Sequence, residues 1–102
     1  MRFKWDTRKA AANKRVHGIS FETAQQVFED PNHVVADNYF IASDGEQRYQ
    51  VIGMTHSLVL LLVVFVDRSE PGGEIIHIIS ARKAVGYEES IYEESICEDQ
   101  FR

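Results

Sequence analysis

Three polar residues recur at a spacing of four in the first part of the chain. Lys9, Asn13 and His17 would lie along one face of a helix, because each step of four residues turns only about 40° from the last. A cation, an amide and an imidazole in a row could hold a phosphate and transfer a proton. The alternative is a solvated polar face that ends in a histidine favoured by the helix dipole.

Three arginines stand at or near the ends of predicted strands. Arg48 follows a turn at Gly45-Glu46, Arg68 follows the most apolar run, and Arg82 follows the last apolar run. A guanidinium group binds phosphate through two parallel hydrogen bonds. The sequence leaves open whether these strand ends meet, and the alternative is three exposed arginines without a shared role.

Three further residues have a chemical and a structural interpretation. Glu46 could be a general base or a turn residue paired with Arg48. Trp5 could stack on a nucleic-acid base or anchor the first strand in the core. His77 lies inside the apolar run Ile75 to Ile79, where a lone histidine is more often half-exposed than catalytic.

The pattern predicts neither a metal site nor a cofactor. The four histidines are scattered, and Cys97 has no second cysteine to pair with. The sequence contains no glycine-rich phosphate loop and no serine elbow. A metabolic enzyme of an unrelated type therefore finds no support in the motifs.

Two helices are predicted to position the first group of residues. Asp6 is placed to cap a helix from Thr7 to His17, and Gly18 suits its end. Ser20 can cap a second short helix, which Pro31 ends. Its apolar residues recur at helical spacing: Phe21, Ala24, Val27 and Phe28.

Strands are predicted before and after these helices. A very short strand covers Phe3 to Trp5, and four longer runs cover Val34–Ile41, Arg48–Thr55, Leu58–Val66 and Ile75–Ala81. Leu58–Val66 is apolar on both faces and is expected at the centre of the sheet. A last helix is expected from Arg82 to about Cys97. Short links between consecutive strands predict a mainly antiparallel sheet, and thus an α+β fold in one domain over 1–102.

Charge divides the chain into a basic head, a balanced body and an acidic tail. The net charge is −5, yet the first 86 residues carry as many basic as acidic side chains. The deficit lies in residues 87–102, within the acidic C-terminal helix and tail, 83–102. The basic head could bind nucleic acid without regard to sequence.

The single cysteine and the lack of a 20-residue apolar segment favour a cytoplasmic protein without membrane contact.

The motifs, in their order and spacing, resemble the BrnT family of toxins. The resemblance runs from residue 3 to about 93. It is carried by Phe3-Lys4-Trp5-Asp6, Lys9-Ala10, Asn13, His17-Gly18-Ile19-Ser20-Phe21, Gly45-Glu46 with Arg48, Ile52-Gly53, Leu60 to Val64, Arg68, Ile78-Ile79-Ser80-Ala81-Arg82-Lys83-Ala84 and Tyr92-Glu93.

The resemblance implies a RelE-like fold and ribonuclease activity in a type II toxin–antitoxin system. It also implies a BrnA-type antitoxin, which would carry the DNA-binding part, so that this chain meets DNA only through its partner. The chain departs from the family pattern at His77, where an arginine is common, at Glu89, where a basic residue is usual, and in its acidic tail.

The resulting hypothesis is a metal-independent endoribonuclease that cleaves RNA and inhibits translation. Arg48, Arg68 and Arg82 would stabilise the phosphate, and His17 and Glu46 would transfer protons. RNA would be bound by residues of the basic head: Trp5, Lys9, Asn13, Lys14 and Arg15. The alternative is a non-catalytic relative that keeps only a surface for RNA or protein.

Overall fold

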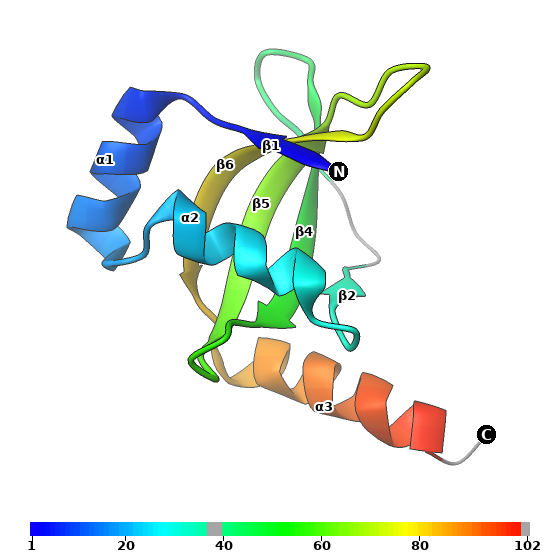
Figure 1. The fold of residues 1–102 in the computed structure, drawn as a ribbon. Coiled ribbons are helices and arrows are strands. Elements are labelled where there is room, and N and C mark those ends of the chain that lie inside the picture. Colours follow the sequence, from blue (N-terminus) through cyan, green and yellow to red (C-terminus); the bar gives the residue numbers. More distant parts are fainter. Residues whose placement is uncertain (37–39, 101–102) are drawn as a thin grey trace.

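The structure, a computed structural model, describes residues 1–36 and 40–100 and is built around one twisted sheet (Figure 1). The strand order is β1-β6-β5-β4-β2, and β3 pairs with β4 outside this path. β1 runs parallel to β6, and the other pairs are antiparallel. The strands are β1 Arg2–Lys4, β2 Val34–Val35, β3 Phe40–Ile41, β4 Gln47–Met54, β5 Leu60–Asp67 and β6 Ile75–Lys83.

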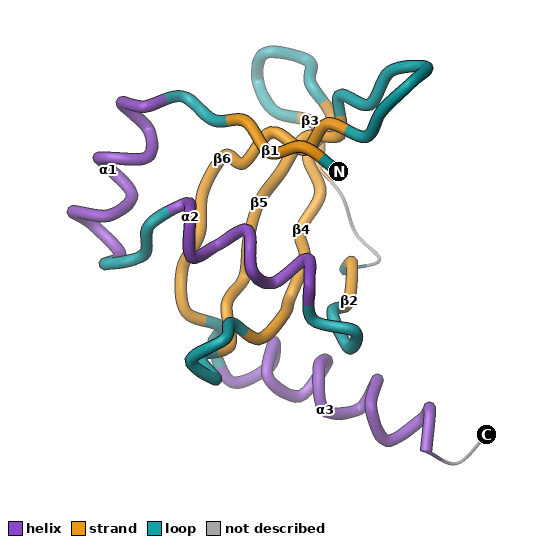
Figure 2. The backbone as a smooth tube through the Cα atoms, in the orientation of Figure 1, coloured by secondary structure: helices purple, strands orange, loops and turns teal. Residues whose placement is uncertain are grey.

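Helices pack on the sheet at three places (Figure 2). The helices are α1 Thr7–His17, α2 Phe21–Ala24, which continues as the 3-10 helix η1 Gln25–Glu29, and α3 Gly86–Gln100. α3 crosses one end of the sheet, whereas the loops before β4 and between β5 and β6 lie at the opposite end (Figure 1). None of the helices among the described residues has the length and apolar character that crossing a membrane requires.

The predicted α+β order is confirmed, with differences at three elements. The first strand joins the same sheet, parallel to β6. The predicted strand Val34–Ile41 is two strands of two residues each, β2 and β3, and its residues 37–39 lie outside the described part. The last helix starts at Gly86 and not at Arg82, because β6 pairs with β5 as far as Lys83.

Local capping explains where the first two helices begin. The Asp6 carboxylate accepts hydrogen bonds from the backbone N–H groups of Arg8 (2.8 Å) and Lys9 (3.1 Å), and so satisfies donors that a helix start leaves free. Gly18 ends α1 with a φ of 74°, a conformation that glycine adopts without strain. The Ser20 hydroxyl accepts from the Thr23 N–H at 3.1 Å and starts α2.

The sheet buries apolar residues on both faces, as expected for a central β5. One face packs against α2 and η1, through residues such as Leu61, Val63, Phe21 and Val27. The other face packs Leu62 and Ile52 against Tyr92 of α3. Alternation along β5 thus places successive side chains in two different cores.

Asp30 fastens α3 to the end of η1 and to β4. Its carboxylate accepts from the Tyr92 hydroxyl at 2.6 Å and from the Met54 N–H at 2.8 Å. Burial, together with this hydrogen bond to Asp30, raises the pKa of Tyr92 to about 12. The contact holds α3 across the end of the sheet where β4 ends, opposite the loop between β5 and β6 (Figure 1).

Candidate active site

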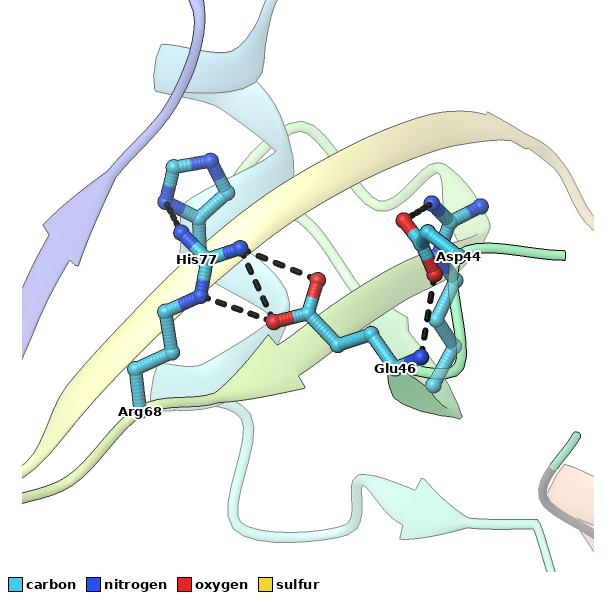
Figure 3. Close-up of polar contacts among 5 residues, drawn as sticks. Asp44, Glu46, Arg68 and His77 are labelled. Atoms are coloured by element: carbon cyan, nitrogen blue, oxygen red, sulfur yellow. Dashed lines mark hydrogen bonds and ion pairs between the residues drawn. The ribbon is translucent and has the colours of Figure 1, made fainter. Parts of the chain in front are cut away.

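Glu46 and Arg68 form an ion pair (Figure 3) at the start of β4 and the end of β5, which is the end of the sheet away from α3 (Figure 1). Arg68 follows β5, and Glu46 immediately precedes β4. Arg68 Nε and Nη2 donate to Glu46 Oε2 at 3.1 and 2.9 Å, and Nη2 also reaches Oε1 at 2.9 Å. Side-chain exposures of 47% for Arg68 and 31% for Glu46 leave the pair accessible to a ligand.

His77 of β6 lies on the other side of the same guanidinium (Figure 3). Its Nδ1 is 3.3 Å from Arg68 Nη1. Burial, followed by the nearby charge of Arg68, lowers the pKa of His77 from its usual value of 6.5. The neutral imidazole is therefore the form favoured at neutral pH.

A second carboxylate–arginine pair lies beside the first. Arg48 Nη2 is 3.3 Å from Asp44 Oδ2, and the backbone N–H of Glu46 donates to Asp44 Oδ1 at 3.0 Å (Figure 3). That backbone hydrogen bond, with the charges of Arg48 and Lys9, lowers the pKa of Asp44. Asp44 thus stays ionised and holds the turn that presents Glu46.

Of the three arginines, the structure brings Arg48 and Arg68 to the same end of the sheet. Arg48 Nε is buried and finds no hydrogen-bond acceptor among residues 1–36 and 40–100. A shallow hollow next to the pair is lined by Glu46, Gln47, Tyr49, Val66, Asp67 and Ser69. The Glu46 carboxylate therefore borders an open, largely polar space, and the Arg68 guanidinium is bound to that carboxylate.

Arg82 lies elsewhere. It pairs with Leu62 in the sheet, whereas Arg68 follows the last residue of β5, so about six residues at roughly 3.3 Å each, or about 20 Å, separate the two. Arg82 Nη1 and Nη2 each donate at 2.9 Å to the Glu88 carboxylate, whose side chain is 3% exposed. The sequence-based role of Arg82 at the phosphate is not supported by this position, since the pair joins β6 to α3.

The three spaced residues of α1, which were predicted to share one helix face, line one groove. It is lined by Lys9, Ala12, Asn13, Val16, His17 and Ile79. Lys9, near the start of α1, is close enough to influence the pKa of both His77 and Asp44. His17 lies eight residues further along the helix, about 12 Å away at 1.5 Å per residue, so the structure does not bring it to Glu46.

Asn13 has a structural position instead of an exposed one. Its side-chain amide donates to the carbonyls of Ile19 and Ala81, both at 2.9 Å, and its oxygen accepts from the Ala81 N–H at 3.1 Å. The residue is 6% exposed. Both amide donors are occupied, so Asn13 fastens α1 to β6 and is not available to RNA in this conformation.

The remaining predicted RNA contacts differ in exposure. Lys14 and Arg15 are exposed in the last turns of α1. Trp5 is half-buried and packs its ring edge-on against Phe21 at a centroid distance of 6.0 Å. The core-anchor interpretation of Trp5 therefore has the clearer contact.

The geometry suits chemistry on a phosphate ester. A carboxylate can take a proton, and two guanidinium groups can stabilise charge on phosphate oxygens. Within the part of the chain that the structure describes, no three His, Cys, Asp or Glu side chains gather as a metal site. The sequence-based interpretation considered His77 but did not assign it to the site. Its one signal was a polar residue between the core isoleucines Ile76 and Ile78.

Comparison with known proteins relates the chain to a protein family and to a solved structure. The model of a family described as the ribonuclease toxin BrnT of type II toxin–antitoxin systems matches residues 5–88. The chain is also similar to the crystal structure of the ribonuclease toxin BrnT of Brucella abortus, with 25% identity and a TM-score of 0.59 over 84% of this chain and 99% of that one. No curated protein matches the chain significantly.

Proposed function

Because this chain belongs to the BrnT family of ribonuclease toxins of type II toxin–antitoxin systems, we propose that it is an endoribonuclease that cleaves RNA at the Glu46–Arg68 pair and thereby inhibits translation. The single observation that carries this proposal is the half-exposed pairing of a carboxylate with a guanidinium at the open end of the sheet. Both residues lie within the range that matches the family.

A substrate phosphate can replace Glu46 on Arg68 with little loss of free energy. Exposed ion pairs contribute only about 0–1 kcal/mol, because water screens them. A guanidinium binds phosphate in the same bidentate geometry as carboxylate. An RNA phosphate therefore displaces Glu46 from Arg68 Nε and Nη2, and the released carboxylate remains next to the bound phosphate.

The displaced Glu46 carboxylate is then the general base. It takes the proton of the ribose 2′-hydroxyl, the 2′-oxygen attacks phosphorus, and the bond to the 5′-oxygen breaks as that oxygen takes a proton from solvent water. The products are a 2′,3′-cyclic phosphate and a 5′-hydroxyl end. Arg68 and Arg48 stabilise the charge on the phosphate oxygens, and Lys9 adds a third cation from α1. These cations supply the charge stabilisation in a reaction that we propose needs no metal.

The type II family implies an antitoxin partner and an RNA target. We propose that the partner is of the BrnA type, that it acts with this chain in the cytoplasm, and that it links the complex to promoter DNA. The exposed cations of α1, including Lys14 and Arg15, would bind an acidic antitoxin segment. The bound segment would then block RNA from the same side chains.

The test is to analyse the ends of RNA incubated with the purified chain and chelator, both as bare RNA and on translating ribosomes. The proposal predicts 5′-hydroxyl and cyclic phosphate ends, and no cleavage at a site whose 2′-hydroxyl is replaced by hydrogen. Binding of RNA without cleavage in either setting would instead support the non-catalytic relative. Growth arrest on expression, relieved by a small protein encoded next to this chain, tests the pairing.

A further inference from the structure

His77 is the one polar side chain of β6 that touches the Glu46–Arg68 pair. Ile76 and Ile78 belong to the core below α2 and η1, so alternation along the strand directs His77 to the opposite face. β1 and β5 flank it, with Lys4 and Val66 as its register partners. The pairing with β1 and β5 thus fixes the backbone position of His77 from both sides.

The contact with Arg68 defines which ring nitrogen carries the proton. A guanidinium can only donate, so His77 Nδ1, at 3.3 Å from Arg68 Nη1, must accept. The neutral ring then carries its proton on Nε2. Glu46 takes Arg68 Nε and Nη2, so the guanidinium is held on one side by a carboxylate and on the other by an imidazole (Figure 3).

Charges from three directions act on this imidazole. Burial and Arg68 favour the neutral ring, Glu46 favours the protonated ring, and the two α1 groups oppose each other, with Lys9 lowering and Asp6 raising the pKa. Lys4, its exposed neighbour on β1, adds a further positive charge. The net effect lowers the pKa of His77, which keeps the Nδ1 lone pair available to Arg68.

We propose that neutral His77 is a positioning residue that holds Arg68 Nη1 in place while an RNA phosphate replaces Glu46 on Nε and Nη2, and that protonation of His77 releases Arg68. This inference rests on the proposed ribonuclease function and adds its regulation by pH. A protonated ring offers no lone pair at Nδ1 and repels the guanidinium, so cleavage falls as the pH drops through the His77 titration.

The activity test uses two variants of His77 and one control. His77→Asn keeps an acceptor for Arg68 but does not titrate. It should cleave RNA at neutral pH and lose the acidic decline that His77 causes. His77→Leu removes the acceptor and should cleave about ten- to hundredfold more slowly at neutral pH, the range expected for a lost hydrogen bond to a charged group. His56→Asn, at the β4–β5 turn, should keep the wild-type pH profile.

A second readout does not depend on cleavage. NMR titration of the histidine ring nitrogens in the whole chain should show His77 protonated on Nε2, with a pKa that rises in Arg68→Ala and falls in Glu46→Gln. A proton on Nδ1, or a His77 titration that Arg68→Ala leaves unchanged, overturns the inference while the ribonuclease proposal stands. If the pairing is seen but the wild type cleaves no RNA, the proposed function fails, and the positioning role in cleavage fails with it.

Discussion

Arg68 and Arg82 each bind a carboxylate with two nitrogens, but their partners differ in burial. The Glu46 side chain is 31% exposed and that of Glu88 is 3% exposed. A buried carboxylate has no access to water and depends on its guanidinium partner, whereas an exposed one can exchange partners. The same residue type therefore forms an exchangeable pair at the candidate site at one end of the sheet and joins two elements at the other.

Arg82→Ala should lower stability instead of removing the site. The substitution leaves the buried Glu88 carboxylate without its guanidinium partner. We expect this to lower the free energy of unfolding by about 2–3 kcal/mol at neutral pH. The loss is smaller than for a fully buried pair because Arg82 is partly exposed. Denaturant unfolding measures the loss. The same change in a Glu88→Gln background should cost clearly less, and an equal cost in both backgrounds would contradict the pairing.

The pH dependence of this pair follows from its direction. Burial raises the pKa of Glu88, but hydrogen bonds from Arg82 and the Val85 N–H outweigh it, so the net pKa is lowered from 4.5. A carboxyl whose pKa is lowered by folding stabilises the folded state at every pH above the pKa that it has in the unfolded chain. The stabilisation is lost as the pH falls below about 4.5. In Arg82→Ala the burial effect remains and the hydrogen bond from the Val85 N–H is left to oppose it without Arg82, so that variant should lose relatively less stability on acidification.

At the scale of elements, Asn13 carries the contact that sets α1 on β6. Asn13→Ala leaves the N–H and C=O of Ala81 and the carbonyl of Ile19 without their partner. We expect a loss of about 2–4 kcal/mol, since buried polar groups without partners are costly. Thermal unfolding measures it. Lys14→Ala, one position along on the exposed side, should change stability by less than about 0.5 kcal/mol, and similar losses in both would reject the role of Asn13.

Local signals in the sequence predicted most of the elements. The capping residues Asp6 and Ser20 marked helix starts that the structure confirms, and the apolar run around Leu61 marked the central strand. Caps and alternation act within a few residues, so a single sequence displays them. The split of the predicted strand Val34–Ile41 had no comparable signal.

Long-range partners could not be predicted in the same way. Asn13 binds Ala81, 68 residues away, and Arg68 binds Glu46 at a separation of 22. The helical spacing of Lys9, Asn13 and His17 predicted that they share one face of α1, and all three line one groove. The spacing could not show that Asn13 is buried. His77 was interpreted as structural because its contact with Arg68 depends on the pairing of β5 with β6.

For the whole molecule, the uneven charge predicts how RNA binding responds to salt. Lys14 and Arg15 are exposed on α1, and each phosphate contact with a single strand adds about 0.7 to the slope of log affinity against log salt. Changing both to Gln should reduce that slope by about 1 to 1.5 in filter-binding or fluorescence titrations. Lys83→Gln, on β6 at the α3 end of the sheet, is the control and should leave the slope unchanged. An unchanged slope in the α1 variant would mean that this helix does not contact the phosphates.

The most direct test of the account compares single-turnover cleavage of a labelled RNA by the wild type, Glu46→Gln and Arg68→Ala, under the conditions, bare or ribosomal, in which the wild type cleaves. Glu46→Gln should cleave about 10²- to 10⁴-fold more slowly, as expected for loss of a general base, while binding RNA at least as tightly, because a competing carboxylate has been removed. Arg68→Ala should lose both cleavage and affinity, and Lys83→Ala should lose neither. Cleavage by Glu46→Gln at the wild-type rate would contradict the central claim that the Glu46–Arg68 pair is the catalytic site.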